Sequence, residues 1–307
     1  MSASGKDCID LRLLGGFQAR LRPGPYLTVP TRKAQALLAY LALPCGVAHP
    51  RDKLAALLWG DMREGQARTN LRQTLFMLRK VLAIRVPDGL RIDAASVALE
   101  PAAVTVDVTA FERLVTQGTS DSLAQAADIY QGDLLQGLAV WEAPFEDWLM
   151  AERERLRELA LEALARLLAH QSKSQATERA IQTAIRLLVL DPLQEPAHRT
   201  LMRLYARQGR RSAALKQYQV CISLLRRELG AEPEPETRRL YEDLLQQRVS
   251  EAAESKARLT RAPGASRWSS PRREPPCTIV SGPAGYSPLA VALPPLCARQ
   301  SLWARGR

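Results

Sequence analysis

The sequence has few aromatic residues, few cysteines and no long apolar run. Aromatic side chains make up 5% of its 307 residues. The five cysteines are odd in number, widely scattered and form no C-x-x-C pair, so neither a disulfide framework nor a zinc site is indicated. The N-terminus has no apolar signal segment, and no stretch of about 18 apolar residues predicts a transmembrane helix. These absences favour a cytoplasmic protein that has reduced thiols and does not use a membrane.

The common sequence motifs of enzymes are missing as well. No G-x-x-x-x-G-K-[ST] loop, H-E-x-x-H pair or G-x-S-x-G elbow occurs. We interpret His49, His170 and His198 as helix-end or surface residues, because they are far apart in helical patterns without acidic or thiol companions. Asp61 and Glu64 are assigned to a helix corner rather than to a metal. We therefore predict that the chain is not an enzyme and has neither a cofactor nor a metal site.

Positive charge, in contrast, is in excess and is concentrated at the two ends of the chain. The formal net charge is +11. Residues 1–110 contain 15 Lys and Arg against 9 Asp and Glu, residues 111–249 contain 19 against 20, and residues 250–307 contain 9 against 3. A basic N-terminal third beside a nearly neutral middle suits the binding of nucleic acid. General solubility is the alternative explanation of the same charge.

The first hundred residues show the pattern of strands, three helices and a hairpin. Short alternating segments broken by Gly and Pro predict two or three antiparallel strands at 9–29. Helices are expected at 32–43, 50–60 and 67–82, and a hairpin is expected from the alternating segments at 90–100 and 104–108. In a winged helix, the third helix enters the major groove of DNA, and the hairpin that follows lies against the backbone or the minor groove.

The third predicted helix has a leucine stripe on one side and a basic surface on the other. Leu71, Leu75, Leu78 and Leu82 fall within about 60° of one another and form the buried stripe. Glu64 is the one acidic residue near the opposite surface, so we expect none of the i,i+4 ion pairs that an ordinary solvated helix has. Phe76 lies among the polar residues, where it either packs against the hairpin or contacts a thymine methyl group.

Arg and Gln can make paired hydrogen bonds with the major-groove edges of guanine and adenine. We assign five residues to the side that faces the bases: Arg68, Thr69, Arg72, Gln73 and Phe76. Cations near helix ends are better placed for phosphates, which fix the register without reading the sequence. Five residues are assigned to this phosphate side: Arg32, Lys33, Arg51, Arg79 and Lys80.

From residue 111 onward the pattern is almost purely helical, and it contains an internal repeat. A shift of 34 residues places Leu167 on Leu201 and Ala180 on Ala214, which is the tetratricopeptide period. We expect one regular and one degenerate repeat, followed by a terminal helix at 235–249 that covers the last apolar face. The predicted fold class is mainly α with a small β component, an N-terminal winged helix-turn-helix followed by a C-terminal tetratricopeptide-like α-solenoid.

Three parts of the chain are expected. They are a winged-helix DNA-binding domain at 1–106, a helical domain at 107–249 and a basic disordered tail at 250–307. The tail is rich in Pro, Gly, Ser and Arg and has no sustained period. It either adds unspecific attraction to DNA or is a solvated extension.

Specific segments resemble a known family of regulators. The segments are "TRKAQALLAYLAL", "HPRDKLAALLWGD" and "ARTNLRQTLFMLRKVL", and they resemble the OmpR-type winged-helix domain of the SARP (Streptomyces antibiotic regulatory protein) class. Residues 107–249 resemble the bacterial transcriptional activator domain that follows in this class. The resemblance implies binding to direct repeats near promoters, a possible homodimer on DNA, recruitment of RNA polymerase and a nucleoid-associated location in the cytoplasm. Larger relatives add further modules after the activator domain, whereas a tail is expected here.

We therefore expect a sequence-specific transcriptional regulator, an activator, whose partner is double-stranded DNA. One alternative is a tetratricopeptide-like adaptor that binds proteins. Another is a truncated signalling protein with a non-essential DNA-binding domain. The third helix separates these possibilities, because an adaptor does not need an exposed surface rich in cations and amides there.

Overall fold

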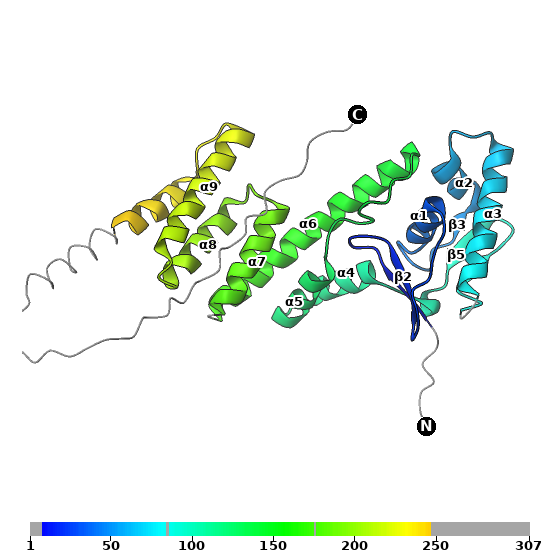
Figure 1. Ribbon diagram of the computed structural model, residues 1–307, viewed down its shortest axis with the longest axis horizontal. Coiled ribbons are helices and arrows are strands. Elements are labelled where there is room, and N and C mark those ends of the chain that lie inside the picture. The colour runs from blue at the N-terminus through cyan, green and yellow to red at the C-terminus, as the bar shows by residue number, and fades with distance from the viewer. Residues whose placement is uncertain (1–7, 84–85, 175, 247–307) are drawn as a thin grey trace, which may run out of the picture. The chain divides into compact units, whose positions relative to one another are not determined.

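The computed structural model describes residues 8–83, 86–174 and 176–246 (Figure 1). The tail expected at 250–307 lies outside the described residues. None of the described helices is both long enough and apolar enough to span a membrane.

Two small sheets belong to the N-terminal part of the chain. In the first sheet, β1 (Cys8–Arg12) pairs antiparallel with β2 (Gln18–Arg22), as expected, and pairs parallel with β6 (Val104–Val106) on its other side. The second sheet has the order β3 (His49–Pro50), β5 (Ser96–Leu99), β4 (Leu90–Ile92). The strands β4 and β5 form the wing.

The expectation that 104–108 belongs to the wing hairpin is wrong. The chain reverses within 93–95, where the Asp93 N–H donates to the Ser96 carbonyl over 2.9 Å, and the hairpin is therefore complete between Leu90 and Leu99. Val104 and Val106 are buried against β1 instead. The alternation of apolar and polar residues at 104–108 does not distinguish pairing with the wing from pairing with β1. Val104 and Val106 would be buried in either arrangement.

Three helices lie between the strands, as predicted. They are α1 (Arg32–Leu41), α2 (Arg51–Trp59) and α3 (Glu64–Leu82). Thr31 caps α1, since its hydroxyl accepts from the Ala34 N–H over 3.2 Å. The leucine stripe of α3 is buried as expected, and Ala67 and Thr74 are buried with it. The winged helix-turn-helix of the predicted fold class is thus present.

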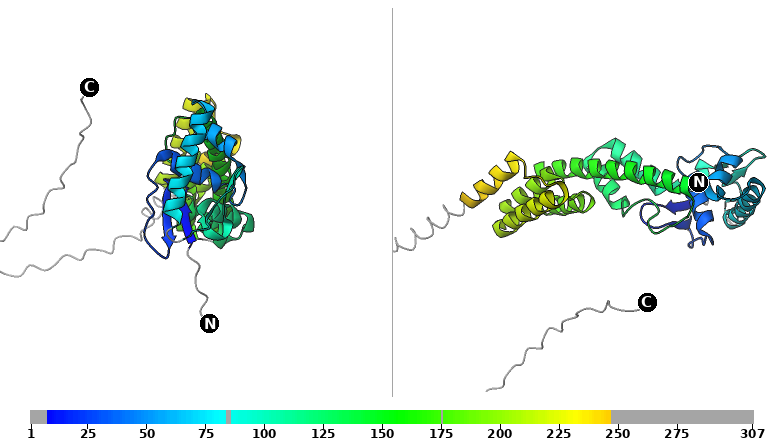
Figure 2. Two further views of the ribbon diagram at one scale, coloured as in Figure 1. Left: turned by 90° about the vertical axis from the view of Figure 1, so that its right-hand side faces the viewer. Right: turned by 90° about the horizontal axis from the view of Figure 1, so that it is seen from above.

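Helices form the rest of the described chain. After a 3-10 turn at Pro101–Ala103 in the N-terminal part, the order from residue 107 is α4 (Asp107–Gln117), α5 (Ser120–Ile129), the long α6 (Ala143–Lys173), α7 (Thr177–Leu190), α8 (Glu195–Arg207) and α9 (Arg211–Leu229). Consecutive helices from α6 to α9 pack on one another, and the right-hand view of Figure 2 shows the length of α6.

The internal repeat is confirmed by these helix positions. Helices α7 and α9 begin at Thr177 and Arg211, which are one 34-residue period apart. Residues 235–246 are also helical. The Tyr241 ring stacks on Tyr218 of α9 with centroids 4.0 Å apart, so the terminal helix covers the last repeat as expected.

The winged helix and the helical region share one apolar core, which extends from Ile9 in β1 to Ala197 in α8. No linker separates them, because β6 ends at Val106 and α4 begins at Asp107. The Asp107 carboxylate accepts hydrogen bonds from the Leu13 and Leu14 N–H groups at 2.8 and 2.9 Å. The domain boundary expected between 106 and 107 stays a prediction, and it falls at a point of close contact.

Candidate nucleic-acid interface

The outer side of α3 is a continuous exposed surface that contains every residue assigned to the bases. At about 100° per residue, its exposed side chains cover roughly 160° of the helix. They are Gln66, Arg68, Thr69, Arg72, Gln73, Phe76, Arg79 and Lys80. Phe76 is 73% exposed, so the interpretation that it packs against the hairpin is wrong. A phenyl ring left in water is available for an apolar contact with a partner.

The expectation that this surface lacks acidic partners is wrong at Arg68. The Arg68 guanidinium lies 2.6 Å from the Glu64 carboxylate, one turn earlier, and 3.0 Å from the Asp52 carboxylate of α2. Both carboxylates are largely exposed, and ion pairs of this kind contribute only about 0 to 1 kcal/mol. Arg68 can exchange these partners for phosphate, but its charge is compensated in the free protein.

Arg72 is placed differently from Arg68. Within the described part of the chain it has no ion pair, and it is exposed at the centre of the outer surface. It lines a polar hollow together with Arg51, Asp52, Arg68, Leu71 and Ala94. Arg51 begins α2 and donates to the Asp93 carbonyl in the wing turn over 3.3 Å. The hollow therefore joins α2, α3 and the tip of the wing.

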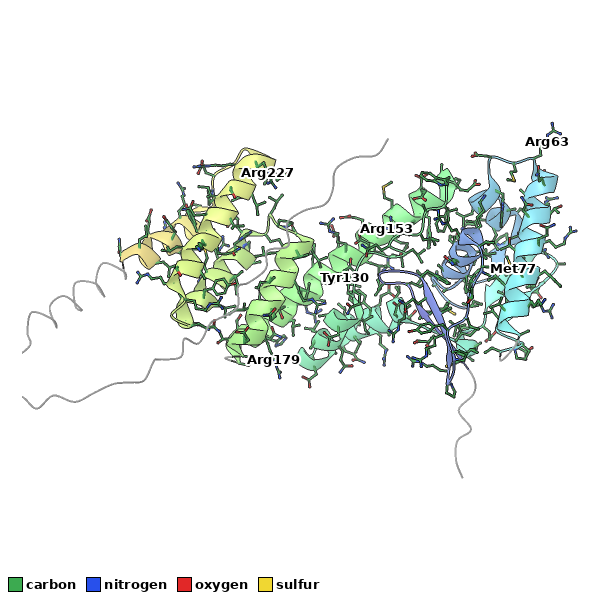
Figure 3. The ribbon with its side chains drawn as sticks, in the orientation of Figure 1. Arg63, Met77, Tyr130, Arg153, Arg179 and Arg227 are labelled. Carbon is green, nitrogen blue, oxygen red and sulfur yellow. The ribbon has the colours of Figure 1, made fainter. Side chains whose placement is uncertain are left out.

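A second hollow lies where α1 meets α3. Among its lining residues are Thr31, Arg32, Asn70, Gln73 and Met77. Figure 3 labels Met77, which packs against the core from the inner side of α3. Arg32 is exposed at the start of α1 and lines this hollow together with Gln73. This hollow extends the polar surface of α3 toward the N-terminus of α1.

Lys33, which was assigned to phosphates, has an internal contact instead. Its Nζ lies 2.6 Å from the buried Glu142 carboxylate and 5.3 Å from the centroid of the Trp59 ring. The other Glu142 oxygen accepts from the Gly60 N–H over 3.1 Å. Lys33 therefore connects α1 to the start of α6. It is not among the residues that we propose to contact DNA.

Two cations of this surface were missed by sequence reasoning. Arg63 precedes α3 and extends away from the ribbon (Figure 3), and the described residues offer it no ion pair. Arg91 is exposed on β4 of the wing, with its Nε 3.9 Å from an Asp93 carboxylate oxygen. Arg63 directly precedes the third helix and Arg91 lies in the hairpin. These positions in the sequence could have indicated that both residues belong to the surface. Among the described residues no cluster of three His, Cys, Asp or Glu could hold a metal.

Comparisons with known proteins concern the helical region and the fold. Residues 102–245 match the family model described as "Bacterial transcriptional activator domain". This segment of the chain therefore belongs to the bacterial transcriptional activator domain family. A comparison with curated proteins found no match. Among solved structures, this chain is similar to Mycobacterium tuberculosis EmbR in complex with a low affinity phosphopeptide, with a TM-score of 0.61 and 24% identity over 79% of this chain.

That match covers 65% of the EmbR chain, and at this identity it concerns the fold. It supports the order of a winged helix followed by a solenoid-like helical domain. The activator-domain match begins at residue 102, five residues before the first helix of the helical region.

Proposed function

We propose that this chain binds specific double-stranded DNA through α3 and the wing, and that it activates transcription. The observation that carries the proposal is the outer surface of α3, on which Arg72, Gln73 and Phe76 are exposed together beside a basic hollow. A surface with amides, an uncompensated guanidinium and an apolar ring matches what the major groove presents: acceptors, donors and methyl groups.

In this proposal α3 lies in the major groove. Arg72 and Gln73 are the residues that read base edges, Thr69 supports them, and Phe76 contacts a thymine methyl group. The Thr69 hydroxyl donates to the Gly65 carbonyl over 2.8 Å, which leaves its methyl group and both oxygen lone pairs for DNA. Arg68 joins the interface once it has exchanged Glu64 and Asp52 for DNA.

The phosphate contacts come from the periphery of the same surface. Arg32, Arg79 and Lys80 are exposed there, and Arg51 lies beside the wing turn. We add Arg63 and Arg91 to this group because they flank α3 and the hairpin. Contacts of this kind fix the orientation of the protein on DNA but do not select a sequence.

We propose in addition that two copies bind direct repeats near a promoter and that RNA polymerase is recruited. The support is the resemblance of the N-terminal segments to SARP-type regulators together with the activator-domain match at 102–245, which shares one core with the winged helix. A nucleoid-associated location in the cytoplasm follows from the same proposal. An adaptor without a DNA-binding role is less well supported, because it gives no reason for Phe76 to be exposed.

The test is a gel-shift titration over salt with the full chain and duplexes recovered by genome-wide footprinting. Each neutralised phosphate contributes about −0.9 to the slope of log affinity against log salt. We expect a steep slope for the unmodified protein and a slope smaller by about one for Arg79→Ala. Weak, salt-independent binding to every duplex, with no repeated half-site among the footprints, would favour the adaptor.

A further inference from the structure

The helices α6 and α8, which begin the two repeats, form a groove that the DNA-binding surface does not include. Its floor is apolar and is made by Leu168 of α6, Leu187 of α7 and Leu204 of α8. Ala165 and Ala169 are small and exposed on the α6 side, which leaves the groove open to a side chain from outside. An open groove with a leucine floor is a common form of binding site for a peptide side chain.

Three cations line this groove. Lys173 ends α6, and Arg203 and Arg207 lie one turn apart on α8. All three are exposed, and none forms an ion pair with a described residue. The lining includes no Asp or Glu among the described residues, while nearby Glu178 accepts from the Gln182 and Gln208 amides.

We propose that this groove binds an acidic segment of a partner protein. One or two apolar side chains of the segment enter between α6 and α8, and its carboxylates pair with Lys173, Arg203 and Arg207. Three like charges around an apolar floor lack a counter-charge among the described residues, and an acidic amphipathic segment supplies both the charge and the apolar surface. The proposal goes beyond DNA binding, since it assigns a second partner to a different surface.

Duplex DNA would compete for the same cations but fits the groove less well. Phosphates can pair with Arg and Lys, yet a leucine floor gives no contact to a phosphate backbone. Carboxylates next to apolar side chains use both features. DNA binding is therefore an outcome that the experiment must be able to show.

The experiment measures fluorescence anisotropy of a short labelled peptide made of Glu and Asp with two leucines, mixed with the full chain. We expect saturable binding and an affinity that falls by about tenfold or more, about 1.4 kcal/mol, for Arg203→Glu combined with Arg207→Glu. Ala169→Trp fills the groove without changing charge and should weaken binding to a similar extent. A peptide with serine in place of leucine should bind more weakly than the leucine peptide.

The charge-matched control combines Arg179→Glu on α7 (labelled in Figure 3) with Arg239→Glu, two exposed arginines that do not line the groove. This control should retain the affinity for the peptide, and circular dichroism should show that all variants are folded. Equal losses in both double variants, or no effect of Ala169→Trp, would contradict the proposal. So would a loss of duplex DNA affinity in the groove variants as large as their loss for the peptide. Because α3 is unchanged in these variants, failure of the groove leaves the DNA-binding proposal intact.

Discussion

Two neighbouring residues of α3, Leu71 and Arg72, lie in different surroundings. Leu71 is 1% exposed in the core, whereas the next residue, Arg72, is exposed without an ionic partner in the described chain. The helix thus separates the residues that maintain the fold from those available to DNA. Substitutions on its two sides should therefore have different consequences.

Arg72→Ala should lower the affinity for specific DNA by about 1 to 3 kcal/mol, because it removes a paired contact with a base edge. Its unfolding temperature should remain that of the unmodified chain. Leu75→Ala should instead lower the free energy of unfolding by about 2 to 5 kcal/mol through the cavity it leaves. Gel shifts and thermal unfolding of both variants test this, and interchangeable effects of the two substitutions would show that the two sides of α3 are wrongly assigned.

Two of the histidines, His49 and His198, are buried. His198 is 2% exposed, its Nε2 donates to the Pro192 carbonyl over 2.9 Å, and its Nδ1 accepts from the Gln217 amide over 2.7 Å. Of the two alternatives for His49 and His198, the surface position is wrong, since both are buried, whereas both do lie near the start of a helix, α2 and α8 respectively. Burial lowers the pKa of His198 below its ordinary 6.5.

A folded-state pKa below the unfolded value means that the unfolded chain takes up the proton first as pH falls. The contribution of neutral His198 to stability is therefore complete above about pH 6.5 and is lost progressively below it. We expect the free energy of unfolding to fall between pH 7.5 and pH 5.5, and to fall less in His198→Gln. Burial and the charge of Lys53 also lower the pKa of His49. The pH dependence of His198→Gln is therefore compared with that of His49→Gln, which removes a second histidine whose pKa is lowered in the same direction. Identical pH dependence in the unmodified chain and His198→Gln would exclude this role of His198.

How far single residues could be predicted from the sequence depends on where their partners lie. The buried leucines of α3 and the exposure of Arg72 follow from helical periodicity alone. The Glu64–Arg68 pair is also local, at i,i+4, and could have been predicted. Asp52 is sixteen residues from Arg68 in sequence, so only the packing of α2 on α3 brings the two together.

At the scale of elements, the start of α6 is joined to the helix-turn-helix by a buried carboxylate. Glu142 is 6% exposed and accepts from Lys33 at the start of α1 and from the Gly60 N–H after α2. Trp148 of α6 packs edge-on against Tyr40 of α1, with centroids 4.9 Å apart. These contacts connect the helix that begins the first repeat to the two helices that support α3.

Removal of the Glu142 carboxylate leaves the Gly60 N–H without its acceptor and Lys33 without its counter-charge. We expect Glu142→Ala to lower the free energy of unfolding by about 1 to 3 kcal/mol, and Glu142→Gln to lower it less, because the amide oxygen can still accept from Gly60. Glu154→Ala, at an exposed position of the same helix, is the control and should change it by about 0.5 kcal/mol or less. Denaturant unfolding measures all three, and equal stabilities of Glu142→Ala and Glu154→Ala would contradict the role of Glu142.

Most elements could be predicted from sequence, whereas their partners could not. The order of strands, helices and wing and the 34-residue period are local patterns, and both are confirmed. The pairing of β6 with β1 joins segments almost a hundred residues apart, and the contacts of Glu142 with α1 and α2 span comparable distances along the chain. Helical and strand periodicity relates residues that are close in sequence and gives no information about pairs this far apart. The sequence therefore predicts a phosphate contact for Lys33, not its pair with Glu142.

In the described chain, the winged helix and the activator domain do not have independent cores. Leu11 and Leu13 of the first are fully buried in the same cluster as Phe111 and Leu135 of the second. The Leu135 N–H also donates to the Leu13 carbonyl over 2.8 Å. The helical region therefore packs directly against the winged helix.

This shared core predicts how a shortened chain behaves. A fragment that ends at residue 106 loses Asp107 from the Leu13 and Leu14 N–H groups, loses Glu142 from Gly60, and exposes leucines whose burial is worth about 1.5 to 3 kcal/mol each. We expect thermal unfolding followed by circular dichroism to show a lower and broader transition for this fragment than for the full chain. A chain that ends at residue 246 keeps every described contact and should unfold as the full chain does. If the fragment unfolded sharply at the temperature of the full chain, the winged helix would be stable by itself, and the contacts across residue 107 would not contribute to its fold.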